Sequence, residues 1–533
     1  MPSPAAASEL RIPRSETKPP RGYERSAREV KRIARRAREV RAELRRRRLE
    51  PTAYTKERGR WQVSWFSHGD ELVQVKVGDA SGAVLEQWRG SQVAWTMARG
   101  YDGAFGRKLN APYVWLPLCV LFLLPFVDPR QPFRLLHLDL IVLLGFGVSH
   151  VFFNRGEIGV SVPLVLPVLV YLLVRTSLAG FRPRQRARPL VPFAPVWLLV
   201  AGIVFLAAFR IGLNVVDSNV IDVGYAGVIG ADRVVDGDPL YGKGFSDDVE
   251  HGDTYGPLTY LLYVPFEQVF TWSGAWDELP AAHGAAISFD LLTMLGLFLL
   301  GSRLRPGRSG RLLGVALAYA WAAFPYTAFA LETNSNDSLV ALFCVLALLA
   351  FTLEPARAGL SGLARGAAIG LGAAAKFAPL ALAPLFAPRR PRALALYLVA
   401  LAAALALTVF PFLPDSGPRE LWDRTVGYQT GRPSPFSLWG QVQSLDWLQT
   451  ALKVAAVALA LAVWVVPRRP GPRRLAALGA AVLLLVQLAT THWFYLYVVW
   501  FLPFVLVAAF TAYREPDEEP PAATPPEHEL VVA

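Results

Sequence analysis

The side chains best suited to chemistry are the aspartates of residues 214–242, which follow an apolar run and a single arginine. Asp217 and Asp222 lie within about 12 residues of the end of that run, where the chain has just left the lipid. A partly desolvated carboxylate has a raised pKa and can take a proton from a hydroxyl group. The later Asp236 and Asp238 belong to the pattern DGDPLYG, which is typical of tight turns. We therefore expect Asp217 and Asp222 to be the candidates for catalysis.

The elements that position these carboxylates are predicted to be membrane helices. Of the 533 residues, 53% are hydrophobic and 18% charged, whereas a soluble protein carries about a quarter charged residues. The apolar residues form runs about as long as the roughly 20 residues that a helix needs to cross a bilayer. Because open sheets and bare loops cannot face lipid, we expect an all-α polytopic membrane protein with about 11–13 transmembrane helices.

Arginine-rich loops orient most of these spans, because Lys and Arg accumulate on the cytoplasmic side. The loops expected in the cytosol are 182–188, 303–308, 389–392 and 468–474. The loops 211–282, 331–336 and 413–448 then lie on the outer face. The candidate spans are residues 111–127, 138–154, 159–175, 194–210, 283–303, 311–330, 337–353, 360–376, 377–388, 393–412, 449–466, 473–490 and 493–512.

Two segments do not fit this topology directly. Three spans before residue 182 would place a cytosolic N-terminus and a cytosolic loop 182–188 in conflict, so one of the three is expected to be re-entrant or miscounted. Residues 255–272 are long enough to cross, but a crossing would expose the loop 303–308 outside. We therefore expect 255–272 to form an interfacial helix on the outer face.

The chain before the first span is basic and is expected to be cytosolic. Residues 1–50 hold 16 Lys and Arg against 7 Glu, which favours retention in the cytosol with attraction to anionic lipid over nucleic-acid binding. We expect a long basic helix at 25–50. Cys119 and Cys344 lie in apolar runs, so neither a disulfide framework, a metal site nor a cofactor is predicted. The expected regions are a disordered or basic helical N-terminus (1–50), a small cytosolic α+β domain (51–110), accessory spans (111–190), a catalytic membrane domain (191–512) and a disordered tail (513–533).

Several short motifs, in their order and spacing, resemble a known family. They are DVGY at Asp222–Tyr225, GDPLY at Gly237–Tyr241, YGPL at Tyr255–Leu258, ETNSND at 332–337, GAAAKFAPLALAPL at 372–385, RPSPFSLWG at 432–440 and THWFYLYVVWFLPF at 491–504. Over roughly residues 190–512 the chain resembles GT-C membrane glycosyltransferases, and within them it is similar to glycosyltransferase family 87, the polyprenol-phosphate-mannose-dependent mannosyltransferases. The usual Tyr-Pro-Pro of that family is Tyr-Gly-Pro here, and about 190 residues precede the region of resemblance.

The resemblance implies transfer of a sugar, mannose in that family, from a polyprenyl phosphate on the external leaflet with inversion at the anomeric carbon. The acceptor hydroxyl must lose its proton as it attacks, so a carboxylate must lie within hydrogen-bond reach. We expect Asp222 to be this general base, with Asp217, Glu332 and Asp337 as the next candidates. The alternative for Asp222 is a solvated or capping residue ahead of a helix.

The leaving phosphate requires cations, for which Lys376, Arg432 and His492 are the candidates. A lysine at membrane depth is costly and indicates function, although Lys376 could instead snorkel to an interface. His492 could be an interfacial anchor, and Arg432 an ordinary solvated residue. Asn334, Asn336 and Asp337 could bind sugar hydroxyls or cap a helix that begins at 337. The resemblance adds Tyr225 and Tyr255 as substrate-binding residues.

Two other classes of protein compete with this interpretation. A lipid or solute transporter or flippase would also be polytopic, and the break at KFAP within 360–388 is typical of one. An interaction scaffold would explain residues 1–110 but not the polar external loops. The abundance of Ala, Arg, Pro and Gly is typical of a GC-rich genome, so we expect the acceptor to be an actinobacterial cell-envelope glycan or glycolipid.

Overall fold

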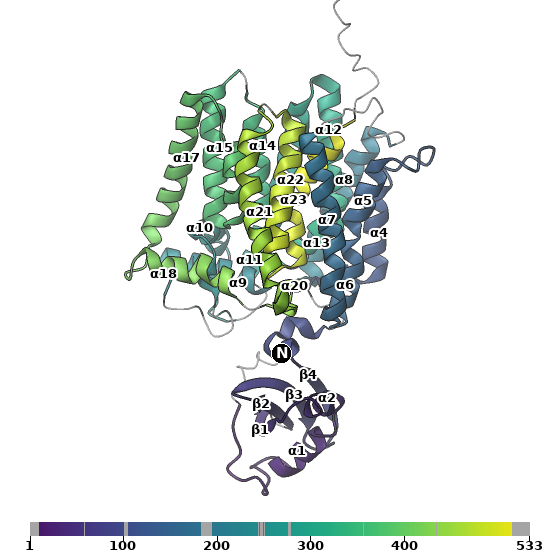
Figure 1. The fold of residues 1–533 in the computed structure, drawn as a ribbon, viewed down its shortest axis with the longest axis vertical. Helices are drawn as coiled ribbons and strands as arrows, with labels where there is room; N and C mark the ends of the chain where they lie inside the picture. Colours follow the sequence, from purple (N-terminus) through teal and green to yellow (C-terminus); the bar gives the residue numbers. More distant parts are fainter. Residues whose placement is uncertain are drawn as a thin grey trace, which may run out of the picture. The chain divides into compact units, whose positions relative to one another are not determined.

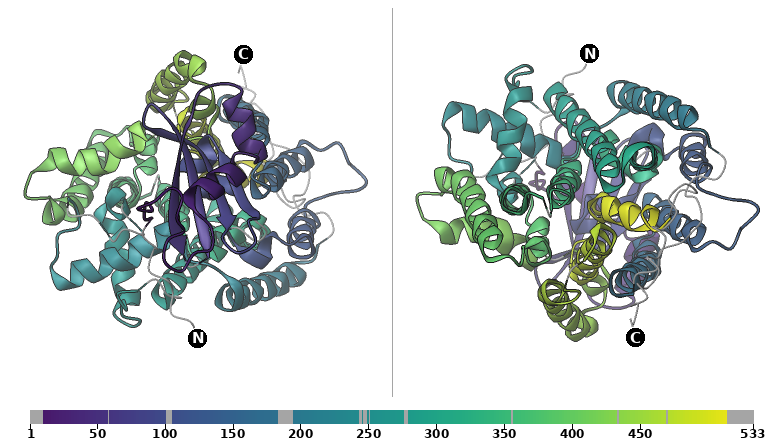
Figure 2. Two further views of the ribbon diagram at one scale, coloured as in Figure 1. Left: turned by 90° about the horizontal axis from the view of Figure 1, so that it is seen from below. Right: turned by 90° about the horizontal axis from the view of Figure 1, so that it is seen from above.

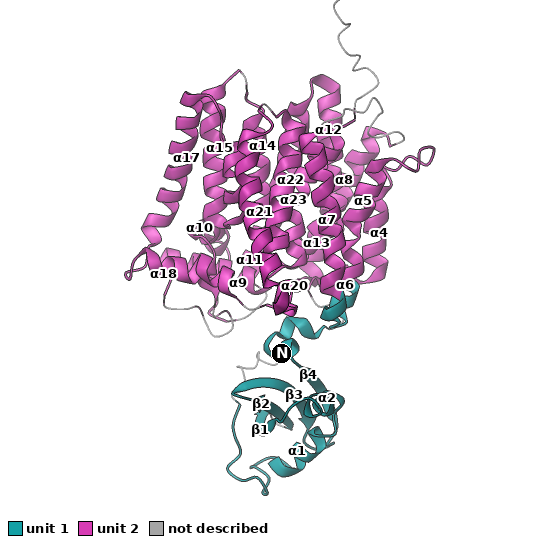
Figure 3. Ribbon diagram, in the orientation of Figure 1, with its two compact units in different colours: residues 1–102, 151–160 teal, residues 103–150, 161–533 magenta. Residues whose placement is uncertain are grey.

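The computed structural model describes residues 10–57, 59–100, 105–182, 194–242, 245, 249, 251–275, 279–354, 356–432, 434–468 and 470–513. The described chain forms two compact units (Figure 3). The first holds residues 1–102 and 151–160, and the second holds 103–150 and 161–533. The predictions for residues 1–9, for most of the loop 182–188 and for the tail after residue 513 lie outside the described residues.

The first unit is built on a four-stranded antiparallel sheet in the order β1-β2-β3-β4. The strands are β1 (Glu50–Glu57), β2 (Arg60–Ser67), β3 (Asp70–Gly78) and β4 (Val84–Arg89). Trp61 pairs with Val77 and Val63 with Val75, and these residues share one buried face. Alternation of apolar and polar residues produces such a face, and this sheet is the strand part of the α+β element predicted near the N-terminus.

Two short helices, α1 (Ala27–Ala34) and α2 (Arg38–Leu44), cover the buried face of the sheet. Ser26 and Glu29 form a capping box that starts α1. Val30 from α1 and Val40 from α2 are both fully buried against the tryptophans of β2. The single long helix expected at 25–50 is therefore wrong: the chain turns at Arg35–Ala37 so that both helices reach one core. The short α3 (Ser91–Ala94) and η1 (Thr96–Arg99) follow the sheet.

The second unit is a bundle of apolar helices, most of which run side by side (Figure 1). Seven helical segments of the described chain are long and apolar enough to cross a membrane, and one bent pair makes an eighth. The seven are Leu135–Asn154, Ile158–Phe181, Val196–Asp217, Pro280–Leu304, Pro391–Phe412, Gln443–Val465 and Pro472–Ala489. The predicted all-α polytopic architecture with a small α+β element at the N-terminus is thus confirmed.

The helices of this unit, with the two spans that begin or end in residues 151–160, have the following bounds. They are α4 (Pro112–Leu123), α5 (Leu135–Leu144), α6 (Phe146–Asn154), α7 (Ile158–Phe181), α8 (Val196–Asp217), α9 (Asp222–Asp236), α10 (Pro257–Glu267), α11 (Pro280–Leu304), α12 (Gly307–Ala323), α13 (Pro325–Glu332), α14 (Asp337–Phe351), α15 (Ala358–Ala375), α16 (Ala383–Phe386), α17 (Pro391–Val409), α18 (Pro418–Trp422), α19 (Tyr428–Gly431), α20 (Leu438–Gln441), α21 (Asp446–Val465), α22 (Pro472–Ala489) and α23 (Val498–Phe510). The bent pair is α12 with α13, and the bend between the two helices is 57°.

One end of the bundle, which we call the arginine face, gathers the loops that are rich in arginine. Arg474 donates to the carbonyl of Gly180 at 2.8 Å, and Arg389 donates to that of Pro467 at 3.1 Å. Arg305 donates to the carbonyl of Tyr513, just beyond α23. The ends of α7, α11, α16 and α21 therefore lie at one end of the bundle, as a common orientation of the loops that begin there requires.

The opposite end, which we call the site face, carries short helices that lie across the bundle, among them α9 and α18 (Figures 1 and 2). The chain also enters the unit here. The backbone N–H of Gly106 donates to Asn219 Oδ1 at 2.9 Å, and that of Lys108 donates to Asp217 Oδ2 at 3.1 Å. Three helical passes, α4, α5–α6 and α7, then lead to the arginine face at residue 182.

The segment predicted to be interfacial forms α10, which has 11 residues. This length is too short to cross a bilayer, which confirms that residues 255–272 do not span. Gly227 and Gly230 of α9 leave room for the rings of Tyr263 and Tyr260 of α10, because a Cβ at either glycine would overlap the facing ring. This close packing fixes α9, and with it the aspartate at the first position of that helix.

Candidate functional site

Asp222 is the first residue of α9, and backbone contacts with a neighbouring turn hold it in place. The N–H of Asn219 donates to the carbonyl of Glu332 at 3.1 Å, and that of Ile221 donates to the carbonyl of Thr333 at 3.3 Å. The helix N-cap is Ile221, so Asp222 is not the capping residue. Its side chain is exposed, although the surrounding protein still removes much of its hydration. This desolvation raises the pKa of Asp222, while Arg432 and Lys376 oppose the rise.

Asp337 begins α14 and accepts hydrogen bonds from two other helical regions. Its Oδ1 lies 2.7 Å from Lys376 Nζ and 2.7 Å from Trp500 Nε1. Asp337 is 1% exposed and Lys376 8%. A buried carboxylate requires such partners, since an unpaired charge in the interior is strongly unfavourable. The lysine is thus held at the end of α15, where its position is fixed by an aspartate and an indole.

Tyr255 contacts the same lysine because α10 begins against the end of α15. The N–H of Gly256 donates to the carbonyl of Ala375 at 3.1 Å, and Thr259 Oγ1 donates to that carbonyl at 2.8 Å. The Nζ of Lys376 lies 5.4 Å from the centre of the Tyr255 ring, which is within the range of a cation–π interaction. Burial raises the pKa of Tyr255 well above its usual value, so the phenol is neutral at physiological pH.

Arg432 and His492 supply the second basic region of the site. Arg432 follows α19, and its guanidinium lies 5.7 Å from the centre of the Tyr428 ring. His492 Nδ1 lies 2.9 Å from Ser434 Oγ, so residues 432–434 and the segment after α22 are joined. Burial, and secondly Arg432, lower the pKa of His492 well below its usual value. His492 is therefore a neutral imidazole at physiological pH and can exchange hydrogen bonds without carrying charge.

The site therefore combines residues that are far apart in the sequence. Arg432 and Lys376 both stabilise the charged form of Asp222, which requires all three to be close in space. Tyr255 also interacts electrostatically with Asp222, Asp337 and Arg432. The structure thus brings together six of the predicted residues: Asp222, Tyr255, Asp337, Lys376, Arg432 and His492. A carboxylate with a raised pKa beside two cations can take a proton and bind an anion in one place.

Three of the four remaining predicted residues, Asp217, Tyr225 and Asn334, are held by structural partners. Asp217 accepts from the backbone of Lys108 and lies 3.8 Å from its Nζ. Tyr225 is fully buried in the core of α9 and α10 and packs edge-on against Trp272. Asn334 has a positive φ and is hydrogen-bonded to Asn214, Ser218 and Asn219, so it fixes a turn.

Two buried residues of the segment that precedes Asp337 in the chain lack hydrogen bonds for their polar side chains. Glu332 is fully buried, and neither of its carboxylate oxygens is hydrogen-bonded within the described chain. The amide group of Asn336 is in the same situation. Such groups are rare in folded proteins. The sequence predicts that Asn336 binds sugar hydroxyls or caps α14; it is the N-cap residue of that helix, but its side chain makes no capping hydrogen bond.

The sequence does not single out Trp500, Tyr497 or Gln429, whereas it predicts that Arg424, like Arg432, is a phosphate contact or an ordinary solvated residue. Trp500 and Tyr497 stack with ring centres 4.3 Å apart, and both belong to an aromatic segment that is also typical of a membrane anchor. Arg424 Nη1 lies 3.6 Å from Asp253, which is 1% exposed, and Gln429 donates to Thr254 at 2.5 Å. These contacts attach residues 418–432 to the segment that precedes α10.

Two further observations concern possible metal ligands at the site and the similarity of the chain to known proteins. Within the ranges that the structure describes, no group of three or more His, Cys, Asp or Glu could hold a metal ion. Residues 254–491 match the family model of glycosyltransferase family 87. This range contains Tyr255, Asp337, Lys376 and Arg432, begins after Asp222 and ends one residue before His492. No curated protein matches the chain.

Proposed function

Because this multi-pass membrane protein is a glycosyltransferase similar to glycosyltransferase family 87, we propose that it transfers mannose from a polyprenyl-phosphate donor to an envelope glycan or glycolipid. The observation that carries the proposal is the electrostatic interaction of Asp222 with two cations, Lys376 and Arg432, at the site face. A base and an anion-binding group are the two requirements of such a transfer.

In the proposed reaction an acceptor hydroxyl oxygen attacks the anomeric carbon of the donor sugar. Asp222 takes the hydroxyl proton as the new carbon–oxygen bond forms. The bond between the anomeric carbon and the phosphate oxygen breaks, and its electron pair leaves with the polyprenyl phosphate. The attack comes from the side opposite the leaving group, so the anomeric configuration inverts. The raised pKa of Asp222 makes its conjugate acid weaker, and the carboxylate a stronger base, than an ordinary aspartate.

The leaving phosphate gains charge as the bond to the sugar breaks. Arg432 and Lys376 are the side chains proposed to meet this charge, since a preorganised cation stabilises the transition state more than the ground state. Asp337, Trp500 and Tyr255 hold Lys376 and act as positioning residues. The neutral His492, linked to Ser434, is proposed to donate a hydrogen bond to a phosphate oxygen or a sugar hydroxyl.

We place the site face outside the cytoplasm, because arginine-rich loops stay in the cytosol and these loops gather at the other end of the bundle. This orientation revises one expectation. Residues 105–110 lie on the site face, and no apolar run long enough to span precedes residue 111, so the basic N-terminal run and the loops cannot both be cytosolic. We take the arginine-rich loops, and not the N-terminal run, as the signal that orients the chain. We therefore propose that the chain enters the membrane from outside the cytoplasm.

The transporter or flippase alternative depended on the break within 360–388. The break falls between α15 and η5 (Ala378–Leu382), directly after the contact between Gly256 and Ala375 at the site face. A transporter would be expected to place such a break, with its ion-binding groups, near the midplane of the membrane. The lysine at this break belongs to the same group as Asp222, Tyr255 and Asp337, and this grouping favours the enzyme.

The proposal is tested by sugar transfer from radiolabelled polyprenyl-phosphate-mannose in membranes that carry the protein. We expect Asp222→Asn to lower the rate by at least about 100-fold, which is the usual contribution of a general base. Asp236→Asn is the matched control, because Asp236 is exposed at the other end of α9. Normal transfer by Asp222→Asn would exclude Asp222 as the base. Activity of the wild type with another polyprenyl-phosphate sugar alone would correct the donor.

A further inference from the structure

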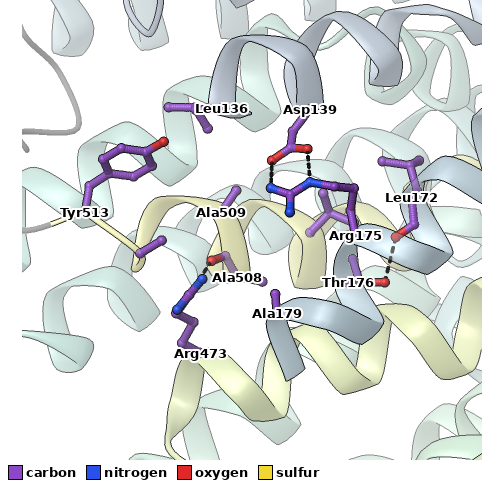
Figure 4. Close-up of a pocket in the computed structure, with 12 residues that line it drawn as sticks. Leu136, Asp139, Leu172, Arg175, Thr176, Ala179, Arg473, Ala508, Ala509 and Tyr513 are labelled. Carbon is purple, nitrogen blue, oxygen red and sulfur yellow. Dashed lines mark hydrogen bonds and ion pairs between the residues drawn. The ribbon is translucent and has the colours of Figure 1, made fainter. Parts of the chain in front are cut away.

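A pocket at the arginine face lies far along the bundle from the residues of the site. It has a cavity volume of about 40 Å³ and is enclosed by α5, α7, α22 and α23 (Figure 4). Its lining includes Leu136, Asp139, Arg175, Arg473 and Tyr513. A single water molecule needs about 10–15 Å³ of such space, so the pocket has room for a group of several heavy atoms.

The wall of the pocket is polar on one side because an ion pair is fixed there. Arg175 contacts Asp139 through two parallel hydrogen bonds, from Nε at 2.7 Å and from Nη2 at 2.8 Å. Tyr171 donates to the same carboxylate at 2.7 Å. Asp139 is thereby neutralised within the wall. Arg473, from α22, lines the pocket and donates its Nε to the carbonyl of Ala508 at 3.2 Å (Figure 4).

Further arginines surround the pocket, so its charge is positive. Arg134 lies 6.0 Å from the ring of Tyr513, and Arg305 donates to the carbonyl of Tyr513. Arg474 donates to the carbonyl of Gly180, next to the pocket residue Ala179. Among the described residues that line or adjoin the pocket, five arginines face two carboxylates, Asp139 and the Asp128 that pairs with Arg134. A positive pocket of this kind attracts an anion.

The neighbouring surface of the same helices is apolar. Leu135 and Leu138 on α5 are 43% and 44% exposed, and Val174 and Leu178 on α7 are 50% and 47% exposed. The rest of the pocket is lined by small or aliphatic residues, among them Leu172, Val505 and Ala509. A ligand with a charged head and acyl chains matches this arrangement, because its head contacts the arginines while its chains lie along the lipid-facing helices.

We propose that this pocket binds the phosphate group of an anionic membrane phospholipid. Arginine is suited to phosphate because its planar fork presents several donors to the oxygens. Basic pockets between transmembrane helices on the cytoplasmic side are a known setting for anionic lipid head groups. The inference is independent of the sugar-transfer reaction, since none of these residues belongs to the site described above.

The test is native mass spectrometry of the purified full-length protein with added dioleoyl-phosphatidylglycerol or dioleoyl-phosphatidylcholine. We expect one phosphatidylglycerol to be retained per chain in preference to phosphatidylcholine. Arg473→Gln should weaken that binding about fivefold, the usual contribution of one arginine near a membrane surface. Arg392→Gln is the matched control: Arg392 is exposed on α17, which begins at the same face but lies at the opposite edge of the bundle from α5 (Figures 1 and 2).

A second variant, Ala179→Leu, fills the pocket and leaves every charge in place. It should also weaken phosphatidylglycerol binding, with the melting temperature of each variant measured to show that the fold persists. Unchanged binding in both variants, or equal retention of the two lipids, would overturn the proposal. Displacement of the lipid by millimolar inorganic phosphate would show that the pocket takes free phosphate and would equally overturn it.

Discussion

At the scale of single residues, the charge next to Asp222 controls the pH at which the site can work. Loss of hydration to the surrounding protein raises the pKa of this carboxyl, and Arg432 opposes the rise. A base must be deprotonated, so the rate of transfer falls as the pH drops through this raised pKa. Arg432→Gln removes the opposing charge, and we expect it to move the acidic limb of kcat/KM to higher pH and to lower the plateau.

The measurement is kcat/KM for sugar transfer between pH 4 and pH 9. Arg419→Gln is the control, because the side chain of Arg419 is 94% exposed and lies in the same segment as Arg432, between α17 and α20. An acidic limb at the same pH in wild type and Arg432→Gln would mean that Arg432 does not act on the base. A plateau that falls without a shifted limb would restrict Arg432 to the leaving phosphate.

Residue types alone predicted part of the site. The position of Asp222 after a span, and the cost of a lysine at membrane depth, both indicate function from the sequence itself. The sequence could not show that Lys376 pairs with Asp337, because two helices, α14 and α15, and the loop between them separate the two residues. It also could not separate Asp222 from Asp217, which follow the same span. Only the fold shows that Asp217 lies beside Lys108 and Asp222 beside two cations.

At the scale of elements, the contact between α10 and α15 determines where Tyr255 lies. A Cβ at Gly256 would overlap the carbonyl oxygen of Ala374, and the Gly256 N–H is used by Ala375. Proline at this position would lose that N–H as well, which explains why the chain has Tyr-Gly-Pro here. We expect Gly256→Ala to push the two helix ends apart, and to lower transfer at least about tenfold because Lys376 loses its aromatic neighbour.

Gly212→Ala is the matched control for this prediction. Gly212 lies inside α8, and a Cβ there meets no other atom within 4 Å. That substitution should leave transfer unchanged and slightly raise the melting temperature, since alanine favours a helix over glycine. Equal transfer by Gly256→Ala and wild type would show that this contact does not position the site.

The elements were predicted unevenly for a physical reason. Long apolar runs such as α7 and α11 have only one favourable structure in lipid, so their existence follows from composition. Short segments at the membrane interface, in contrast, have several favourable structures. Residues 377–388 were expected to span, but they form η5 and the four-residue α16, neither of which is long enough to cross. Packing on α15 and α22 decides their structure, and no periodicity in the sequence records that packing.

At the scale of the whole molecule, the two ends of the bundle must lie on opposite sides of the membrane. Lys108 is on the site face with 59% of its side chain exposed, and Arg392 is exposed on the arginine face. We expect a membrane-impermeant thiol reagent to label Lys108→Cys in intact cells, and Arg392→Cys only after the cells are opened. The two native cysteines lie within helices and are replaced by serine in the background.

Labelling in the reverse order would put the site face in the cytosol. The external donor leaflet would then be wrong, whereas the grouping of Asp222, Lys376 and Arg432 would remain. A cytosolic site face would agree with the basic run of residues 1–50, so this experiment also decides which of the two charge signals orients the chain.

The hydrogen bond from Trp500 to Asp337 has a practical consequence for work with shortened chains. One carboxylate oxygen accepts from both Lys376 and Trp500, so the last helix completes a contact made in the middle of the sequence. A protein truncated before α23 would retain every residue of the family match, 254–491, and would still be recognised by homology. It would nevertheless lack the indole that fixes the buried carboxylate, and an inactive truncation would therefore say nothing about the residues that it keeps.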